Sequence, residues 1–189
     1  MKIIVIDNYD SFTYNLVQYI QEIIGGKIDV FRNDAIAISE IEKYDKIILS
    51  PGPGLPSETT NLKEIIKKYA PTKSILGVCL GHEAIAEVFG GSLKILEKVY
   101  HGIATDILLT DKKDSLFNEL SNNFQAGRYH SWVVNTSDFP RDLEITAVDS
   151  QGEIMALAHK KYDVKGVQFH PESVLTPEGK TILRNFLKS

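Results

Sequence analysis

The stretch Ser74-Ile75-Leu76-Gly77-Val78-Cys79-Leu80-Gly81-His82 decides how this chain folds, and it contains the only cysteine of the protein. The apolar run 74–78 predicts a buried parallel strand, and the segment 80–89 predicts a helix that ends at Gly90-Gly91. Cys79 is therefore expected at a sharp turn between the strand and the helix. Such a turn lifts a nucleophile above the carboxyl edge of an α/β sheet and points the next backbone N–H toward it.

Two interpretations of Cys79 are open at this point. A thiol at the start of a helix feels the positive end of the helix dipole, which favours the nucleophilic thiolate. Alternatively, Cys79 is an inert residue of the core, because free cysteine is among the most buried residue types. The Gly-x-Cys-x-Gly pattern does not decide between them, so the decision depends on the rest of the chain.

The residues on either side of this stretch form two patterns. In the first half, apolar runs alternate with amphipathic segments, which predicts strands at 3–6, 28–31 and 46–49 and helices at 12–24 and 60–69. After Gly91 the expected elements are short strands at 92–97, 103–109, 143–149 and 154–159, with a hairpin turn at 149–152. A last buried strand is expected at 165–169, followed by a helix that Thr176 caps and that has Pro177 at its first position. The fold class is therefore α/β: an open, doubly wound, mostly parallel sheet with antiparallel additions, flanked by helices.

Length and composition limit the class of protein. A chain of 189 residues with 43% hydrophobic and 24% charged residues is expected to form one globular domain over 1–189. The formal net charge of −4 makes a nucleic-acid partner unexpected, and no apolar run approaches the ~20 residues that span a bilayer. The single cysteine excludes an internal disulfide framework and fits a cytoplasmic location, and no Cys/His cluster has the spacing of a zinc site.

The loop Ser50-Pro51-Gly52-Pro53-Gly54-Leu55-Pro56 follows the predicted strand 46–49. Its alternating prolines and glycines exclude helix and strand, so we expect a rigid loop at the carboxyl edge of the sheet, where open α/β sheets bind ligands. The backbone N–H groups of Gly52 and Gly54 would be free to bind a ligand there. The alternative is a plain connecting turn, although such a turn needs only one proline or glycine.

His170 is the histidine best placed to act with Cys79. It ends the buried run 166–169, so we expect it at the same edge of the parallel sheet as Cys79. Pro171 keeps the backbone extended, which turns Glu172 to the same face as His170 and lets its carboxylate orient the imidazole as a general base. The alternative is a surface His-Pro-Glu tripeptide at the end of a strand.

Cys79, His170 and Glu172 have the residue types of a nucleophile, a base and an orienting group. The N–H of Leu80 and a glycine N–H of the proline–glycine loop would form an oxyanion hole. Together these groups predict acyl transfer through a thioester, with hydrolysis as the default outcome. The residues alone do not name the acyl donor.

Three motifs in this order, Pro51–Gly54, Gly77–His82 and Phe169–Glu172, resemble those of the class I (triad) glutamine amidotransferase family. The segment Asp7–Asn15 resembles the start of the glutaminase subunits of anthranilate synthase and aminodeoxychorismate synthase, without separating the two. Arg128–Trp132 is close to the family's Arg-Tyr-His-Ser-Leu segment. The resemblance covers essentially the whole chain and implies the flavodoxin-like fold of that family.

The resemblance also implies a glutaminase reaction. Cys79 would attack the side-chain amide of L-glutamine, His170 would pass a proton to the leaving ammonia, and water would hydrolyse the glutamyl thioester. The substrate contacts that the resemblance implies are Gly52, Pro53, Gly54, Leu80, Glu83, Ser131 and Trp132. Ammonia would pass to a chorismate-binding synthase subunit. That partner would hold chorismate and Mg²⁺, so no cofactor or metal is expected in this chain.

Glu83 departs from the family pattern, which usually has Gln four residues after the nucleophile. An ionised Glu accepts hydrogen bonds but cannot donate one, so Glu83 would be protonated, turned away, or facing the substrate ammonium.

Two other functions stay open: a free-standing γ-glutamyl or peptide hydrolase on the same scaffold, and a catalytically weak regulatory subunit. Dependence of the activity on a partner would separate the glutaminase subunit from the hydrolase.

Overall fold

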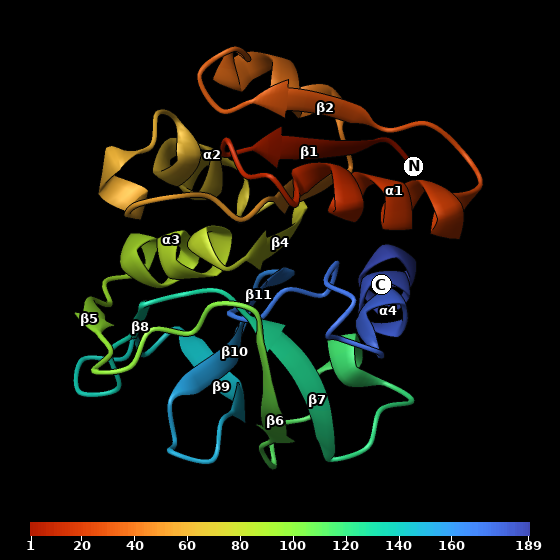
Figure 1. Cartoon of the computed structure of the whole chain (residues 1–189). Helices are drawn as coiled ribbons and strands as arrows, with labels where there is room; N and C mark the ends of the chain where they lie inside the picture. Colours follow the sequence, from red (N-terminus) through yellow and green to blue (C-terminus); the bar gives the residue numbers. More distant parts are fainter.

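The computed structural model describes every residue from 1 to 189 and shows a nine-stranded sheet with helices on both faces (Figure 1). The strand order is β2-β1-β3-β4-β11-β10-β9-β6-β7. These strands are β1 (Ile3–Asp7), β2 (Asp29–Arg32), β3 (Lys46–Leu49), β4 (Ser74–Val78), β6 (Ile103–Leu109), β7 (Asn123–Arg128), β9 (Leu143–Val148), β10 (Ile154–His159) and β11 (Val164–Val167). The α-helices are α1 (Thr13–Ile24), α2 (Leu62–Tyr69), α3 (Leu80–Val88) and α4 (Gly179–Lys188). Short 3₁₀ helices lie at Ile38–Lys43, Pro56–Glu58 and Ser115–Phe117.

The parallel half of the sheet comes mainly from the first half of the chain. β1 pairs in parallel with β2 and β3, β3 pairs with β4, and β4 pairs with β11. Every residue of β1 and β3 is buried, as expected for central strands covered on both faces. Alternate residues of these strands pack into two cores, one under α1 and α4 and the other under α2 and α3 (Figure 1). The predicted doubly wound α/β fold is confirmed.

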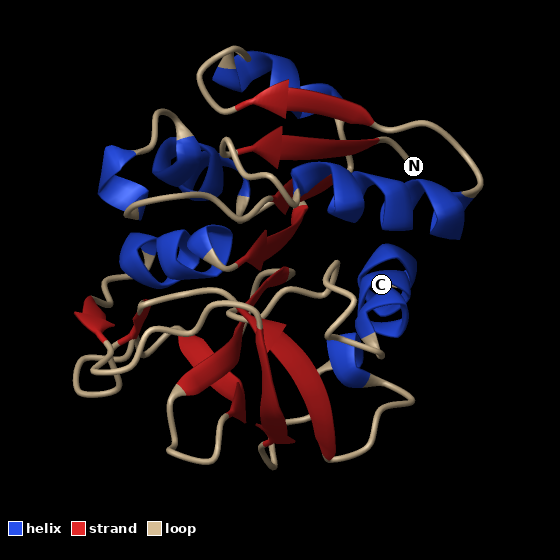
Figure 2. Cartoon of the chain, in the orientation of Figure 1, coloured by secondary structure: helices blue, strands red, loops and turns tan.

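The remaining strands of the main sheet are antiparallel additions (Figure 2). Of these, β6, β9 and β10 were predicted, whereas β7 was not. The expected hairpin turn at 149–152 joins β9 to β10. The expected strand 92–97 is shorter than predicted and lies outside the main sheet, because β5 (Leu93–Ile95) pairs only with β8 (Trp132–Val134). None of the helices combines the length and the hydropathy that crossing a bilayer requires.

The carboxyl ends of β1, β3, β4 and β11 lie at one edge of the sheet, because parallel strands share one direction. The segments that leave these strands carry the candidate site.

The predicted start of the last helix at Thr176 is wrong, since α4 begins at Gly179. The Thr176 hydroxyl instead donates to the carbonyl of His170 at 2.7 Å and accepts from the N–H of Gly127 at 2.9 Å. This hydroxyl therefore joins the segment after β11 to β7 and does not cap α4 as expected.

Candidate active site

The backbone of Cys79 adopts a conformation that few residues tolerate, with φ 50° and ψ −102°. Its N–H donates to the carbonyl of Val167 at 2.8 Å, which ties the turn after β4 to β11. A Cβ at Gly77 would lie 2.4 Å from the carbonyl carbon of Gly81, and a Cβ at Gly81 would lie 2.8 Å from the carbonyl oxygen of Leu49. The turn therefore requires glycine on both sides of Cys79. The predicted strand–turn–helix unit is confirmed.

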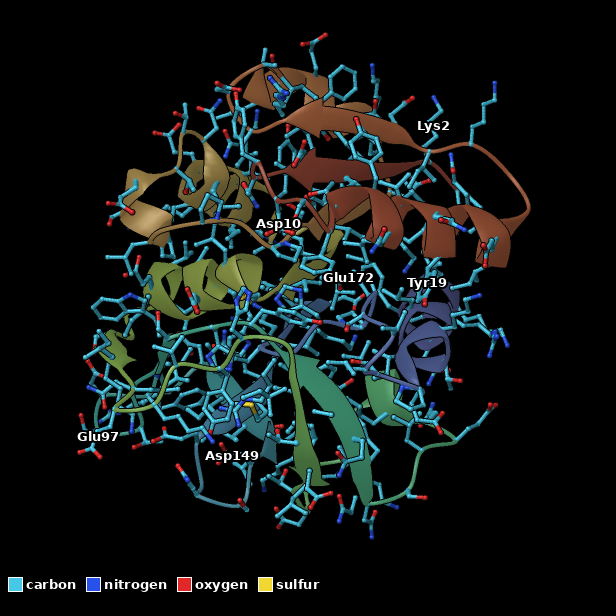
Figure 3. All side chains as sticks on the ribbon, viewed as in Figure 1. Lys2, Asp10, Tyr19, Glu97, Asp149 and Glu172 are labelled. Carbon is cyan, nitrogen blue, oxygen red and sulfur yellow. The ribbon has the colours of Figure 1, made fainter.

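The surroundings of the Cys79 thiol disfavour the thiolate. Burial raises the pKa of Cys79 well above its ordinary value, and the carboxylates of Glu83, Glu172 and Asp10 raise it further. Asp10 and Glu172 come from opposite ends of the chain and both lie near the middle of the molecule (Figure 3). The N–H of Leu80 lowers the pKa of Cys79, but by less than burial raises it. The expected thiolate is therefore wrong for the resting protein, and the thiol needs a base to ionise.

His170 and Glu172 form a buried pair that supplies such a base. Nδ1 of His170 lies 2.6 Å from Oε1 of Glu172, and the side chains are 2% and 0% exposed. Because the carboxylate binds Nδ1, the tautomer is set and the other ring nitrogen is left to accept a proton. Nε2 of His170 is buried and has no hydrogen-bond partner in the protein. This is the geometry of an oriented general base.

Rings and backbone bonds hold the His170 imidazole in place. The ring centroids of Phe12 and Tyr129 lie 5.7 and 4.8 Å from that of His170, and both rings meet it edge-on. The N–H of His170 donates to the carbonyl of Gly127 at 2.9 Å. Phe12 directly precedes α1, and Gly127 and Tyr129 lie at the end of β7 and directly after it. Three separate parts of the chain therefore position the base.

A cavity of about 150 Å³ lies beside Cys79. Its lining consists of Gly52, Pro53, Gly54, Cys79, Glu83, Tyr129, His130, Ser131 and Trp132. Of the substrate contacts expected from the sequence, only Leu80 is absent from this lining. Its side chain lies against Gly52, where an added Cβ would come within 2.5 Å of Leu80 Cδ2. Two larger hollows, of about 380 and 370 Å³, contain neither Cys79 nor His170, so cavity size alone does not locate the site.

Comparison with known proteins decides the family. The family model described as glutamine amidotransferase class-I matches residues 4–189. This chain belongs to the class-I glutamine amidotransferase family. The resemblance that the three motifs indicated is thereby confirmed over nearly the whole chain.

Two relatives of this amidotransferase chain have informative names. Aminodeoxychorismate/anthranilate synthase component 2 of Bacillus subtilis is 47% identical over 189 residues, which are 99% of this chain and 96% of that protein. The bifunctional protein TrpGD of Thermotoga maritima is 48% identical over 98% of this chain, which spans only 32% of that relative's length. A solved glutamine amidotransferase of Thermotoga maritima has a TM-score of 0.79 at 17% identity, covering 100% of this chain and 96% of its own. That last likeness supports the fold alone.

The proline–glycine loop of this amidotransferase is held by Asn8, which follows β1. The N–H and the side-chain amide of Asn8 donate to the hydroxyl and the carbonyl of Ser50, both at 2.8 Å. An added Cβ at Gly52 would lie 2.7 Å from that of Asn8, so only glycine fits. The N–H groups of Gly52 and Gly54 donate to no protein acceptor, which leaves them free to bind a ligand.

Glu83 lies in the cavity wall and is 3% exposed. Nε2 of Gln168 donates to its Oε1 at 2.9 Å and lies 3.7 Å from Sγ of Cys79. Burial raises the pKa of Glu83 to about 8, although the bond from Gln168 lowers it. Of the three states considered for Glu83 from the sequence, the protonated one therefore predominates at neutral pH.

Reasoning from the sequence missed two residues of this site. Gln168 is the only polar side chain in the buried run 166–169, and a buried amide needs partners, so that position was an available signal. Arg128 is 1% exposed and pairs with Asp149 at 2.8 Å. That pairing joins the end of β7 to the turn after β9, which are distant in the sequence, and no local pattern could have indicated it.

Proposed function

We propose that this chain hydrolyses the side-chain amide of L-glutamine and delivers the ammonia to a chorismate-using synthase subunit, for anthranilate or 4-amino-4-deoxychorismate synthesis. The observation that carries the proposal is the buried His170–Glu172 pair, whose free Nε2 lies at the same edge of the sheet as Cys79. Family membership supports glutamine as the acyl donor. The name of the Bacillus subtilis relative supports the choice of acceptor reactions.

The proposed reaction begins when Cys79 Sγ attacks the amide carbon and its proton moves to Nε2 of His170. The Glu172 carboxylate stabilises the resulting imidazolium, which it already binds through Nδ1. His170 then protonates the leaving nitrogen, the C–N bond breaks, and ammonia departs from a glutamyl thioester. Water, deprotonated by His170, attacks the thioester, and glutamate leaves as the thiol recovers its proton.

Backbone N–H groups would stabilise the negative oxygen that develops on the amide carbon. Leu80 N–H follows the nucleophile directly, and Gly52 N–H is unused in the protein. Each donor of this kind contributes about 10²–10³ in rate. The polar backbone of Ser131 and Trp132 would bind the α-amino and α-carboxylate groups, with Pro53 and Gly54 as the facing wall.

The surface next to the catalytic pair fits a protein partner. Val174 is 88% exposed and lies two residues after Glu172, and Tyr14 is 67% exposed and lies two residues after Phe12, whose ring contacts His170. Large apolar side chains this exposed are suited to burial in an interface. We place the synthase subunit on this surface, where ammonia could pass to it without entering bulk water. Chorismate and Mg²⁺ would be bound by that subunit, and this chain would need no cofactor.

The deciding experiment is labelling of the purified chain with 6-diazo-5-oxo-L-norleucine, a glutamine analogue with an electrophilic side chain, with and without excess glutamine. Intact mass and peptide mapping should place one label on Cys79, and glutamine should block it. Cys79→Ala is the matched control and should remain unlabelled. A thiol that the analogue does not label would favour the regulatory subunit. Glutaminase turnover that is already maximal without a synthase subunit would favour the free-standing hydrolase.

A further inference from the structure

A buried chain of polar side chains lies behind the wall of the cavity formed by residues 129–132. Nη1 of Arg128 lies 2.8 Å from Oδ2 of Asp149, and Nε of Arg128 donates to Nε2 of His130 at 3.0 Å. Nδ1 of His130 lies 2.8 Å from the carbonyl oxygen of Trp132. The arrangement therefore connects a carboxylate, through a guanidinium and an imidazole, to one backbone carbonyl of the cavity wall.

The hydrogen bonds define the state of the imidazole. A guanidinium has no acceptor, so Nε2 of His130 must accept from Arg128 and carries no proton. The single ring proton is then on Nδ1 and is donated to Trp132. Burial, together with the charge of Arg128, lowers the pKa of His130 to about 3, so this neutral tautomer persists throughout the physiological range. His130 differs in this respect from His170, whose free nitrogen is available to a proton.

Arg128 is held firmly enough to define the position of His130. The ring of Tyr100 lies 3.6 Å from the guanidinium carbon of Arg128 and stacks on the His130 ring at 5.7 Å and 20°. Oδ1 of Asp149 accepts from the N–H groups of Gln151 and Glu153, both at 2.9 Å. Arg128 and Asp149 are 1% and 3% exposed, so neither charge can leave the other without a large cost in desolvation.

Three backbone carbonyls along this wall, those of His130, Ser131 and Trp132, accept hydrogen bonds from within the protein. The His130 carbonyl accepts from Tyr100 N–H at 3.0 Å, and the Ser131 carbonyl accepts from Leu96 N–H at 2.8 Å. The Trp132 carbonyl is bound by the His130 side chain instead of by another backbone group. The bond from the His130 side chain is therefore the third of the hydrogen bonds that fix the orientation of the peptide groups in the wall.

We propose that His130 is a positioning residue that holds the Ser131–Trp132 backbone in the orientation that binds the amino-acid end of glutamine. This inference rests on the proposed function and extends it to a residue that transfers no proton and does not attack the substrate. Loss of the bond would leave a buried carbonyl unpaired and free the peptide to rotate, which predicts about a tenfold loss of glutamine binding. The reactivity of the Cys79 thiol should be unaffected.

The test compares two alkylating agents on the same variants. Iodoacetamide has no amino-acid end and reports the thiol alone, whereas 6-diazo-5-oxo-L-norleucine needs both ends of the site. For His130→Leu, the second-order labelling rate of Cys79 by the glutamine analogue should fall about tenfold, and the rate with iodoacetamide should stay within about twofold of wild type. His130→Asn retains a donor near the position of Nδ1 and should recover most of the lost rate.

His159→Leu is the matched control. Nδ1 of His159 also binds backbone, accepting from the N–H groups of Lys161 and Tyr162, but His159 ends β10 at the opposite edge of the sheet. It should label at the wild-type rate with both reagents. If His130→Leu does not fold, His130→Asn is compared with His130→Gln, whose amide cannot occupy the Nδ1 position and which should label more slowly.

Three results would overturn the inference. Equal labelling of His130→Leu and wild type by the glutamine analogue would show that the bond does not position the substrate. Parallel loss with both reagents would assign His130 a merely structural role. If the analogue fails to label even the wild-type protein, the proposed function is wrong together with this inference. The first two results would overturn the inference and leave the proposed function intact.

Discussion

Nε2 of Gln168 donates to Oε1 of Glu83 at 2.9 Å and lies 3.7 Å from Sγ of Cys79. The carboxyl group of Glu83 is therefore connected through one amide to the proposed nucleophile. Charge on Glu83 raises the pKa of Cys79, and burial raises the pKa of Glu83 itself to about 8. We therefore expect the Cys79 thiol to be less reactive when Glu83 is ionised.

Glu83→Gln should lower KM for glutamine by about threefold at pH 8. The amide matches the carboxyl group in size, donates hydrogen bonds at every pH, and removes the partial negative charge beside the thiol. Steady-state glutaminase kinetics in the presence of the synthase subunit would measure the change. An unchanged or higher KM would contradict it.

The same substitution should change the pH profile. Below pH 8 the folded protein keeps Glu83 protonated, and above it the new charge disfavours both the thiolate and the developing oxyanion. The wild-type kcat/KM should therefore fall as the pH rises through about 8, and Glu83→Gln should lose less activity there. The profile of kcat/KM is measured from pH 6 to 9.5. An equal loss of kcat/KM above pH 8 in wild type and in Glu83→Gln would argue against an effect of the Glu83 charge.

Glu83 should also affect stability in a defined pH window. Its pKa is raised on folding from 4.5 to about 8, so between these values the folded state holds a proton that the unfolded state has lost. The free energy of unfolding of the wild type should then fall with rising pH across this window, relative to Glu83→Gln, by about 5 kcal/mol in total. Urea unfolding at pH 4, 6 and 8.5 would measure it. A difference that is constant over the three pH values would exclude this linkage.

Glu172→Gln should lower kcat about a hundredfold and leave KM for glutamine nearly unchanged. The amide can keep the bond to Nδ1 of His170, but it cannot stabilise the imidazolium that forms during attack. Glu22→Gln is the control, because Glu22 is an exposed partner of Lys180. A similar loss of kcat in both variants would point to a general effect on the fold.

Gly77→Ala should destabilise the protein by about 2 to 3 kcal/mol and abolish labelling of Cys79. The new Cβ would meet backbone atoms of Gly81, which cannot move without opening the turn. Gly26→Ala is a matched control, since its Cβ would find only Ile24 at 3.9 Å. Urea unfolding and labelling are measured on both variants, and a neutral result at Gly77 would show that the turn can adjust.

Val174→Asp should weaken binding of the synthase subunit about tenfold, because it puts a charge into the proposed interface. Ser121→Asp adds the same charge just before β7, at the opposite edge of the sheet, and should bind as wild type does. Titration calorimetry with the purified synthase subunit would measure both. Equal affinities for the two variants would place the interface elsewhere.

Much of the fold and part of the site could be predicted because the relevant signals are local. The strand, the turn and the helix around Cys79 depend on a few neighbouring residues, and so does the rigid loop at 50–56. His170 and Glu172 are two residues apart, so extended backbone alone brings them to one face. Parallel pairing of β4 with β11 then follows from the alternation of strands and helices.

Other features of the site could not be predicted, because they depend on burial and on contacts between distant segments. The helix after Cys79 indicated a thiolate, but the thiol is buried among carboxylates from three segments and stays protonated. Thr176 was expected to cap a helix, yet it binds His170 and Gly127.

By itself, the sequence determined which residues could carry acyl-transfer chemistry, since residue type and local spacing are enough to set turns, strands and the facing of neighbouring side chains. Only the tertiary structure decided their ionisation states and orientation. The pKa of a side chain depends on its desolvation and on the hydrogen bonds and charges of all the groups packed around it. For Cys79, Glu83 and His130 these neighbouring groups come from segments that are distant in the sequence.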